Sequence, residues 1–186
     1  MNDENSTAPI GGVRQIAIET RTTGLSVIAG DRVIEIGCVE LVNRKLSGNS
    51  KHFYVNPERD SDEDAIKVHG VSNAFLRDKP KFPQVADELV AYLRGAEVII
   101  HNAWFDIWFL NAELARAGRP DLKQVVHSVA DTLLMAKQSS PGLLNSVDAL
   151  CERLHVNMPG SAYQGALLTA EKVAHVYLHL TCAAHR

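Results

Sequence analysis

The sequence predicts an α/β protein, in which a mixed five-stranded sheet carries helices on both faces. Three observations lead to this prediction. The N-terminal third contains strand-like segments with period-two alternation, and residues beyond about 60 change to helical spacing. A short, nearly all-apolar segment at 96–102 then has the composition of a strand that is covered on both faces. We therefore expect three antiparallel strands followed by two parallel ones.

The antiparallel part is predicted from three segments. Residues 14–20 form the first strand, residues 32–42 alternate strictly between two faces, and residues 51–56 form the third strand. Gly48 and Asn49 are typical turn residues, so we expect them in a turn before the third strand.

Helices and parallel strands alternate in the rest of the chain. Pro83 suits the first turn of a helix, and Gly118 is expected to end the helix that follows the all-apolar strand. A fifth strand is expected at 124–132. Predicted helices span 62–69, 83–94, 102–117, 131–137, 146–154 and 162–180.

Composition limits the broad class of the protein. The 186 residues are 46% apolar and 22% charged, which suits one globular domain, predicted at 14–186, behind a polar disordered leader at 1–13. No apolar run approaches the length of a membrane span, and the N-terminus lacks the layout of a signal peptide. Three scattered cysteines without a CxxC pair fit reduced thiols in the cytoplasm. With a net charge of −3, a nucleic-acid partner needs a local basic patch.

Several stretches resemble a known family in the same order along the chain. They include "RQIAIETRTTG", "RVIEIGCVELVNRKLSGN", "HNAWFDIWFL" and "QGALLTAEKVAHVYL". The resemblance is to DnaQ-type 3′–5′ exonucleases, the family of the proofreading epsilon subunit of bacterial DNA polymerase III. It implies an RNase H-like fold and hydrolysis of DNA from the 3′ end. In that chemistry, carboxylates hold two divalent cations and a histidine acts as general base on the attacking water.

The resemblance also implies which positions would carry the chemistry, and most of them are substituted. Glu19 stands where the family has its first aspartate, and Arg21 where it has a glutamate. Asp106 matches the aspartate that the family has in its second motif. Gln164 replaces the catalytic histidine, and Thr169 replaces the last aspartate.

These substitutions remove the chemistry at three of the five positions. Arg21 keeps its positive charge near neutral pH, and Gln164 cannot accept a proton from water. We therefore expect an inactive or severely impaired relative with no cofactor. The alternative is an active Mg²⁺- or Mn²⁺-dependent 3′–5′ exonuclease with an atypical site, in which Glu19 and Asp106 hold the metal. Our hypothesis for Arg21 is that it pairs with both of these carboxylates; the alternative is that it turns to solvent.

The same resemblance suggests where nucleic acid would bind. The tight turn at residues 22–24 would approach the terminal nucleotide, whereas Trp104 would either stack on a base or pack in the core. The expected partners are a single-stranded DNA 3′ end and subunits of DNA polymerase III, with no membrane. Asp131 and Asp148 are expected to have capping or surface roles. The candidate binding residues are Thr22, Thr23, Gly24, His69, Asn102 and Trp104.

Overall fold

A computed structural model describes residues 13–158, 161 and 164–182. The leader predicted at 1–13 lies outside these residues except for Val13, and the single domain predicted at 14–186 stays a prediction. Within the described ranges, no helix is both long enough and apolar enough to cross a bilayer.

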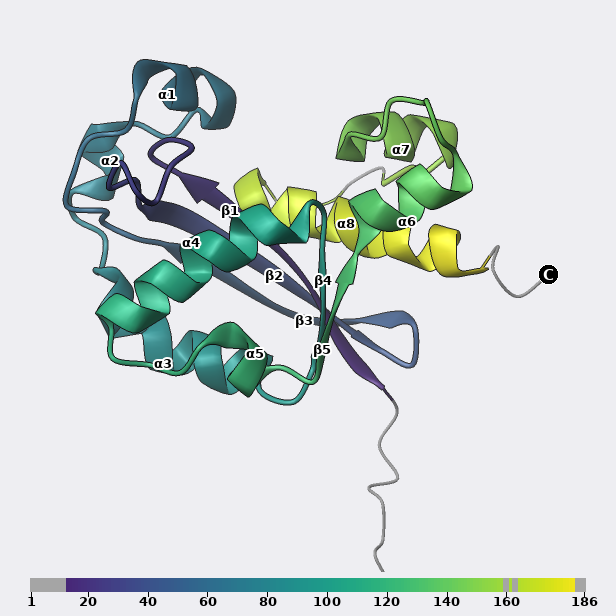
Figure 1. Ribbon diagram of the computed structural model, residues 1–186, viewed down its shortest axis with the longest axis horizontal. Helices are drawn as coiled ribbons and strands as arrows, with labels where there is room; N and C mark the ends of the chain where they lie inside the picture. The colour runs from purple at the N-terminus through teal and green to yellow at the C-terminus, as the bar shows by residue number, and fades with distance from the viewer. Residues whose placement is uncertain (1–12, 159–160, 162–163, 183–186) are drawn as a thin grey trace, which may run out of the picture.

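The strands form one five-stranded mixed sheet in the order β3-β2-β1-β4-β5 (Figure 1). Pairing is antiparallel between β1 and β2 and between β2 and β3, and parallel between β1 and β4 and between β4 and β5. The predicted fold class is therefore confirmed. The strands are β1 (Arg14–Thr22), β2 (Val33–Val42), β3 (Lys45–Tyr54), β4 (Glu97–Ile100) and β5 (Ser128–Asp131).

Helices cover both faces of the sheet. One core joins the sheet to α3, α4 and α5, and a second joins the opposite face to α8, against which α6 and α7 pack. Helices α1 and α2 follow β3 at one end of the sheet (Figure 1). The helices are α1 (Glu63–His69), α2 (Asn73–Leu76), α3 (Phe82–Leu93), α4 (Ala103–Arg116), α5 (Leu122–Val125), α6 (Thr132–Ser139), α7 (Val147–Arg153) and α8 (Gly165–Cys182).

Two local predictions were wrong. The chain turns between β2 and β3 at Asn43 and Arg44, both with positive φ, and Gly48 lies inside β3 rather than in a preceding turn. The register of the β2–β3 pairing shifts between Val39 and Leu41, so this part of β3 is irregular. Gly48 adopts a positive φ of 83° in this irregular stretch. The predicted strand at 124–132 begins with the last turn of α5, and β5 starts only at Ser128.

Gly37 determines how closely α8 approaches the sheet. A Cβ atom at this position would lie 2.3–2.5 Å from backbone atoms of Ala166 and Leu167. The first turn of α8 therefore rests directly on β2. The consequence for the site is that the start of α8 lies over the end of β1, since Gly37 pairs with Glu19 across the two strands.

Candidate active site

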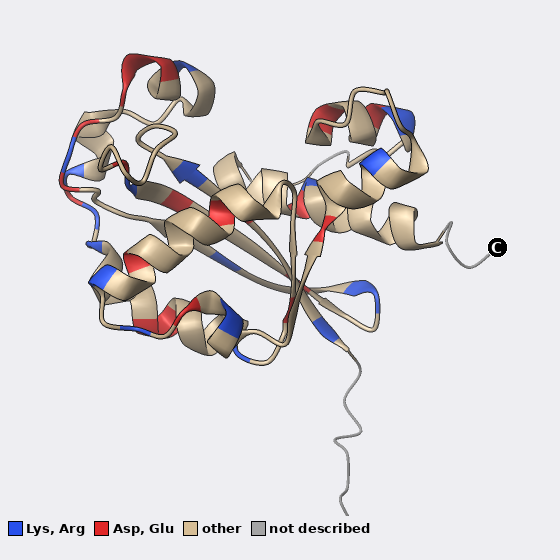
Figure 2. Ribbon diagram, in the orientation of Figure 1, with Lys and Arg blue, Asp and Glu red and all other residues tan. Residues whose placement is uncertain are grey.

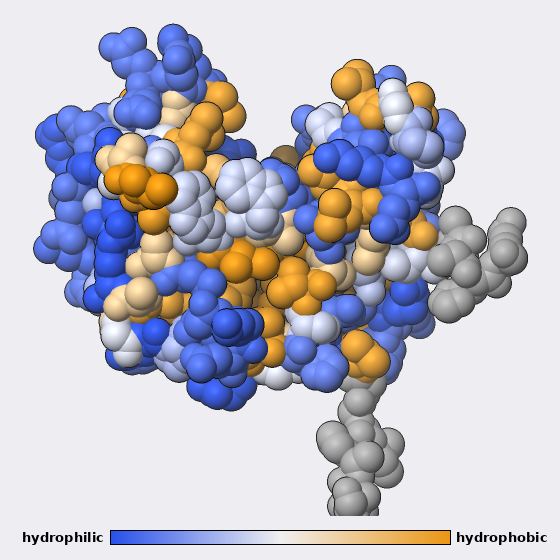
Figure 3. Space-filling view, in the orientation of Figure 1, coloured by the Kyte–Doolittle hydropathy of each residue, from blue (hydrophilic) through white to orange (hydrophobic). Residues whose placement is uncertain are grey.

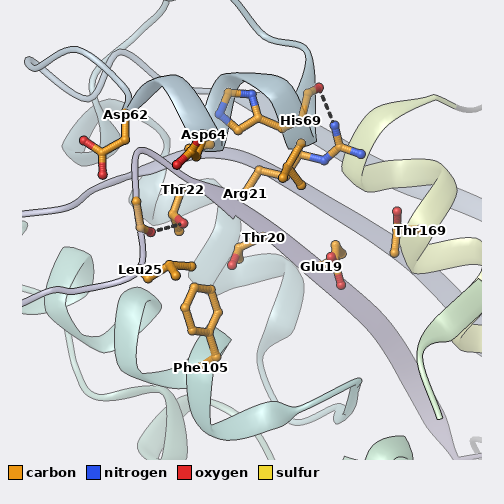
Figure 4. A pocket seen from close by; sticks show the side chains of 13 residues that line it. Glu19, Thr20, Arg21, Thr22, Leu25, Asp62, Asp64, His69, Phe105 and Thr169 are labelled. Carbon is orange, nitrogen blue, oxygen red and sulfur yellow. Dashed lines mark hydrogen bonds between the residues drawn. The ribbon is translucent and has the colours of Figure 1, made fainter. Parts of the chain in front are cut away.

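The end of β1, the start of α4 and the start of α8 meet at one end of the sheet. A cavity of about 570 Å³ opens there against α1. Figure 3 shows the molecule hollowed between the lobe that carries α1 and the lobe that carries α7. Figure 4 shows the cavity from close by. Its lining includes Glu19, Arg21, Leu25, Val68, His69, Phe105 and Thr169.

Asp106 is held beneath this site by hydrogen bonds. It lies in the first turn of α4, where it is only 4% exposed. Its Oδ1 accepts hydrogen bonds from the backbone N–H of Thr20 at 2.9 Å and from the Thr20 hydroxyl at 2.7 Å. Burial raises the pKa of Asp106 to about 6, although the two hydrogen bonds from Thr20 oppose this rise.

Glu19 is the second carboxylate of the site. Burial raises its pKa well above the ordinary range, and the nearby negative charge of Asp106 raises it further. The positive charge of Arg21 opposes this effect without cancelling it. Glu19 therefore takes up a proton readily, and a protonated carboxyl group is a poor ligand for a divalent cation.

The raised pKa of Glu19 makes a testable prediction about stability. Because the folded state binds this proton more tightly than the unfolded state, ionisation of Glu19 costs stability as the pH rises above its unfolded pKa. We expect Glu19→Gln to be more stable than the natural protein at about pH 8, and the gain to shrink toward about pH 4. Urea unfolding at both pH values measures it. An equal gain at both pH values would mean that Glu19 is not strained by its charge.

Arg21 does not make the predicted pair with Glu19 and Asp106. Its Nε lies 3.5 Å from Oε2 of Glu35, and its Nη1 donates a 2.7 Å hydrogen bond to the carbonyl of His69 (Figure 4). Within the described part of the chain, no ion pair joins Arg21 to either carboxylate of the site. The physical reason is the register of the hairpin, because Arg21 and Glu35 are directly opposite on β1 and β2.

Glu35 is the residue of this site that sequence reasoning missed. Its side chain is fully buried, and Oε1 accepts a 2.8 Å hydrogen bond from the backbone N–H of Ala166 and lies 2.7 Å from Nε2 of His52. Burial alone would raise the pKa of Glu35. The bonds from His52 and Ala166, with the charge of Arg21, outweigh burial and lower it. Glu35 thus stays ionised and ties β2 to α8.

Gln164, directly before α8, and Thr169, on α8, lie on different sides of Arg21. Thr169 lines the first cavity with Glu19, and its hydroxyl donates to the carbonyl of Gly165. Gln164 is exposed and lines a second cavity of about 470 Å³, together with Glu35. Arg21 and His69 line both cavities, so they form the wall between them.

The donor set does not fit the pair of divalent cations that the family resemblance implies. Glu19 favours its protonated form, one oxygen of Asp106 already accepts two hydrogen bonds, and Arg21 brings a fixed positive charge to the cavity. In the part of the chain that the structure describes, no three His, Cys, Asp or Glu side chains are grouped to hold a metal ion.

The structure brings some of the predicted nucleic-acid contacts to the cavity. Thr22, Gly24 and His69 line it, and the Thr22 hydroxyl donates to the carbonyl of Gly24. Thr23 does not line it. Its side chain is fully buried, and its hydroxyl donates a hydrogen bond to Asp31. This bond holds the loop after β1 together.

The remaining candidates lie around the start of α4. Asn102 precedes the helix with a left-handed backbone (φ 68°), and it lines neither cavity. Trp104 is 62% exposed and also lies outside both cavities. As predicted, Asp131 is a cap, accepting backbone hydrogen bonds at the starts of α4 and α6, and Asp148 is a surface residue that pairs with Lys172.

Comparisons with known proteins give a consistent result. The exonuclease family RNase_T matches residues 16–171. The DNA polymerase III subunit epsilon of Rickettsia felis is 45% identical over 173 residues, which are 92% of this chain and 76% of that protein. The Escherichia coli protein of the same name is 46% identical over 173 residues, 90% of this chain and 71% of its own length.

Solved structures share the fold at low sequence identity. Exonuclease X in complex with 5′ overhanging duplex DNA aligns with a TM-score of 0.68 and 23% identity, over 94% of this chain and 93% of that chain. Exonuclease I from Methylocaldum szegediense aligns with a TM-score of 0.78 and 13% identity, over 94% of this chain and 41% of that chain. These neighbours support the RNase H-like fold.

Proposed function

Because the chain belongs to the exonuclease family, we propose that it binds the 3′ end of single-stranded DNA without cutting it, or while cutting it only very slowly. A role beside subunits of DNA polymerase III is part of this proposal, and it rests on the names of the most similar relatives. The site, rather than the fold, decides between binding and catalysis.

The observation that carries the proposal is the ion pair between Arg21 and Glu35. It places a guanidinium at the wall of the cavity, at a position where the family resemblance implies a metal-binding glutamate. A fixed positive charge repels a divalent cation, and the cross-strand pair holds it in place. Gln164 also stands where the family resemblance implies the general base, and its amide cannot accept a proton from water.

The cavity itself suits a nucleotide. Leu25 and Phe105 give it apolar walls on the side away from Thr169 (Figure 4), and Val68 adds a third apolar side chain to the lining. Such walls favour the flat faces of a base. Its volume of about 570 Å³ lies in the ordinary range of small-molecule sites.

His69 adds a hydrogen-bond donor at this wall. Its Nδ1 accepts a hydrogen bond from the backbone N–H of Val71, and burial followed by the charge of Arg21 lowers its pKa. The neutral ring therefore carries its proton on Nε2. Nε2 is buried and has no hydrogen-bond partner among the described residues, so an acceptor such as a phosphate oxygen reaches it only when the His69 ring turns toward the cavity.

A paired binding and cleavage experiment tests the proposal. A single-stranded oligonucleotide with a fluorophore at its 5′ end is mixed with the full chain in EDTA, and binding is followed by anisotropy. The same oligonucleotide is then incubated with Mg²⁺ and, separately, with Mn²⁺, and its length is followed on a gel. We expect binding in EDTA and no shortening with either metal. Blocking the 3′ hydroxyl with a bulky group should weaken binding.

Two results would contradict the proposal. Shortening by the natural protein that Asp106→Ala abolishes would establish the alternative, an active exonuclease with an atypical site. Absence of binding to any oligonucleotide in EDTA would remove the nucleic-acid role and leave the partnership with polymerase subunits.

A further inference from the structure

We infer that Trp104 and Trp108 form a stacking platform for a second unpaired base, next to the nucleotide in the cavity. This inference rests on the proposed function and extends it, because it defines the ligand as a single-stranded segment of at least two nucleotides. The platform consists of these two side chains only, and neither lines the two cavities described above.

The geometry of α4 places the platform beside the cavity. Successive residues of an α-helix are rotated by about 100°, so Trp104 and Trp108 share one side and Phe105 lies between that side and the side of Asp106. Phe105 lines the cavity, and its ring meets that of Trp104 edge-on with centroids 5.8 Å apart. An aromatic surface thus runs around the helix from the cavity to the outside.

The two indole rings are arranged for stacking rather than for burial. Their centroids are 6.2 Å apart and their planes differ by 30°. Trp108 is anchored, since it packs against the main core and meets Phe109 at 5.8 Å. Trp104 is 62% exposed, although it is one of the largest apolar side chains of the protein.

The charges around the cavity favour bases over phosphates as the main contact. The nearby arginines already have acidic partners: Arg21 pairs with Glu35, Arg32 with Glu113, and Arg59 with Asp31. Acidic and basic residues are interspersed over the fold rather than collected into one basic stripe (Figure 2). A strand that binds here gains little from neutralising phosphates, so stacking on aromatic faces, which every base permits, supplies the affinity.

The two tryptophans are the only ones in the chain, so tryptophan fluorescence, excited at a wavelength that the four tyrosines do not absorb, reports on the platform. In EDTA, we compare thymidine 5′-monophosphate with a thymidine tetranucleotide. We expect the tetranucleotide to quench the fluorescence and the mononucleotide to leave it nearly unchanged. Trp104→Ala should weaken tetranucleotide binding about tenfold or more, and Trp104→Phe should keep most of the affinity. Binding of the tetranucleotide should depend only weakly on salt.

Matched controls separate the platform from the cavity. Leu144→Ala removes another exposed apolar side chain, 82% exposed and outside both cavities, and should change nothing. Val68→Glu alters the cavity wall and should weaken binding of the mononucleotide, which calorimetry measures. Trp104→Ala should leave binding of the mononucleotide unchanged.

The outcomes are distinguishable. If both probes bind and Trp104→Ala changes the affinity for neither, the inference about the platform is wrong, while the proposed function stands. If neither probe binds, the proposed function fails as well. If the natural chain self-associates in sedimentation and Trp104→Ala abolishes that without altering tetranucleotide affinity, the exposed indole serves a protein contact, and the inference is overturned.

Discussion

A variant that carries Glu19→Asp, Arg21→Glu, Gln164→His and Thr169→Asp is expected to shorten a single-stranded oligonucleotide from its 3′ end, whereas the natural protein is not. The four changes restore the residue types that the family resemblance implies, on a site where Asp106 is already held by Thr20. A positioned general base alone contributes roughly 10²–10⁴-fold, so the variant should exceed the natural protein by about a hundredfold or more.

The restored variant should also respond to metal before any substrate is added. Arg21→Glu places a carboxylate opposite Glu35 on the neighbouring strand, which costs stability until a cation is bound. At about 100 times its dissociation constant, a bound ion stabilises the folded state by about 2.7 kcal/mol. We expect Mn²⁺ to raise the melting temperature of the variant and to leave that of the natural protein unchanged.

Controls show what the result means. Asp106→Ala in the restored background should abolish both cleavage and the Mn²⁺ response. A folded variant that binds Mn²⁺ without cutting would place the loss of activity outside the four positions. Stabilisation of the natural protein by Mn²⁺ would contradict our account of Arg21.

Breaking the ion pair between Arg21 and Glu35 is expected to have the largest effect on stability. Arg21→Met leaves the fully buried Glu35 carboxylate without its cation, although His52 and the Ala166 N–H remain. Loss of one partner of a buried pair typically costs about 3–5 kcal/mol. Because the Arg21 side chain is 24% exposed, we expect about 2–3 kcal/mol, measured as the change in the urea midpoint.

A double-mutant cycle isolates the pair. Arg21→Met combined with Glu35→Gln should recover part of the loss, since the buried charge is then gone. The matched control is Lys172→Met, which breaks a surface pair to Asp148, itself 83% exposed, and should cost less than about 1 kcal/mol. If Arg21→Met costs no more than this control, Arg21 is not held by Glu35 in solution.

Much of the fold follows from local patterns in the sequence. The alternation in β2, the all-apolar β4 and the helix beginning after Asn102 were predicted at nearly the observed places. The family resemblance, rather than periodicity, identified Glu19 near the end of β1 and Asp106 at the start of α4 as site residues. Periodicity succeeds here because burial on a sheet or helix face is set by residue spacing.

What the patterns could not supply was register. The partner of Arg21 depends on how the ten residues of the loop at 23–32 are folded, and on a register shift between Arg21 and Thr22. Both depend on tertiary contacts such as that of Thr23 with Asp31. For the same reason, the irregular part of β3 around Gly48 was taken for a turn.

The ion pair between Arg21 and Glu35 also bears on how easily evolution could reverse the loss of the family residues. Replacing Arg21 alone by an acid would set two carboxylates opposite each other with no cation to separate them. Replacing Gln164 or Thr169 first would return a base or a ligand to a site that still holds a guanidinium. Each of these single steps therefore loses stability or gains nothing, so none of them is favoured by itself.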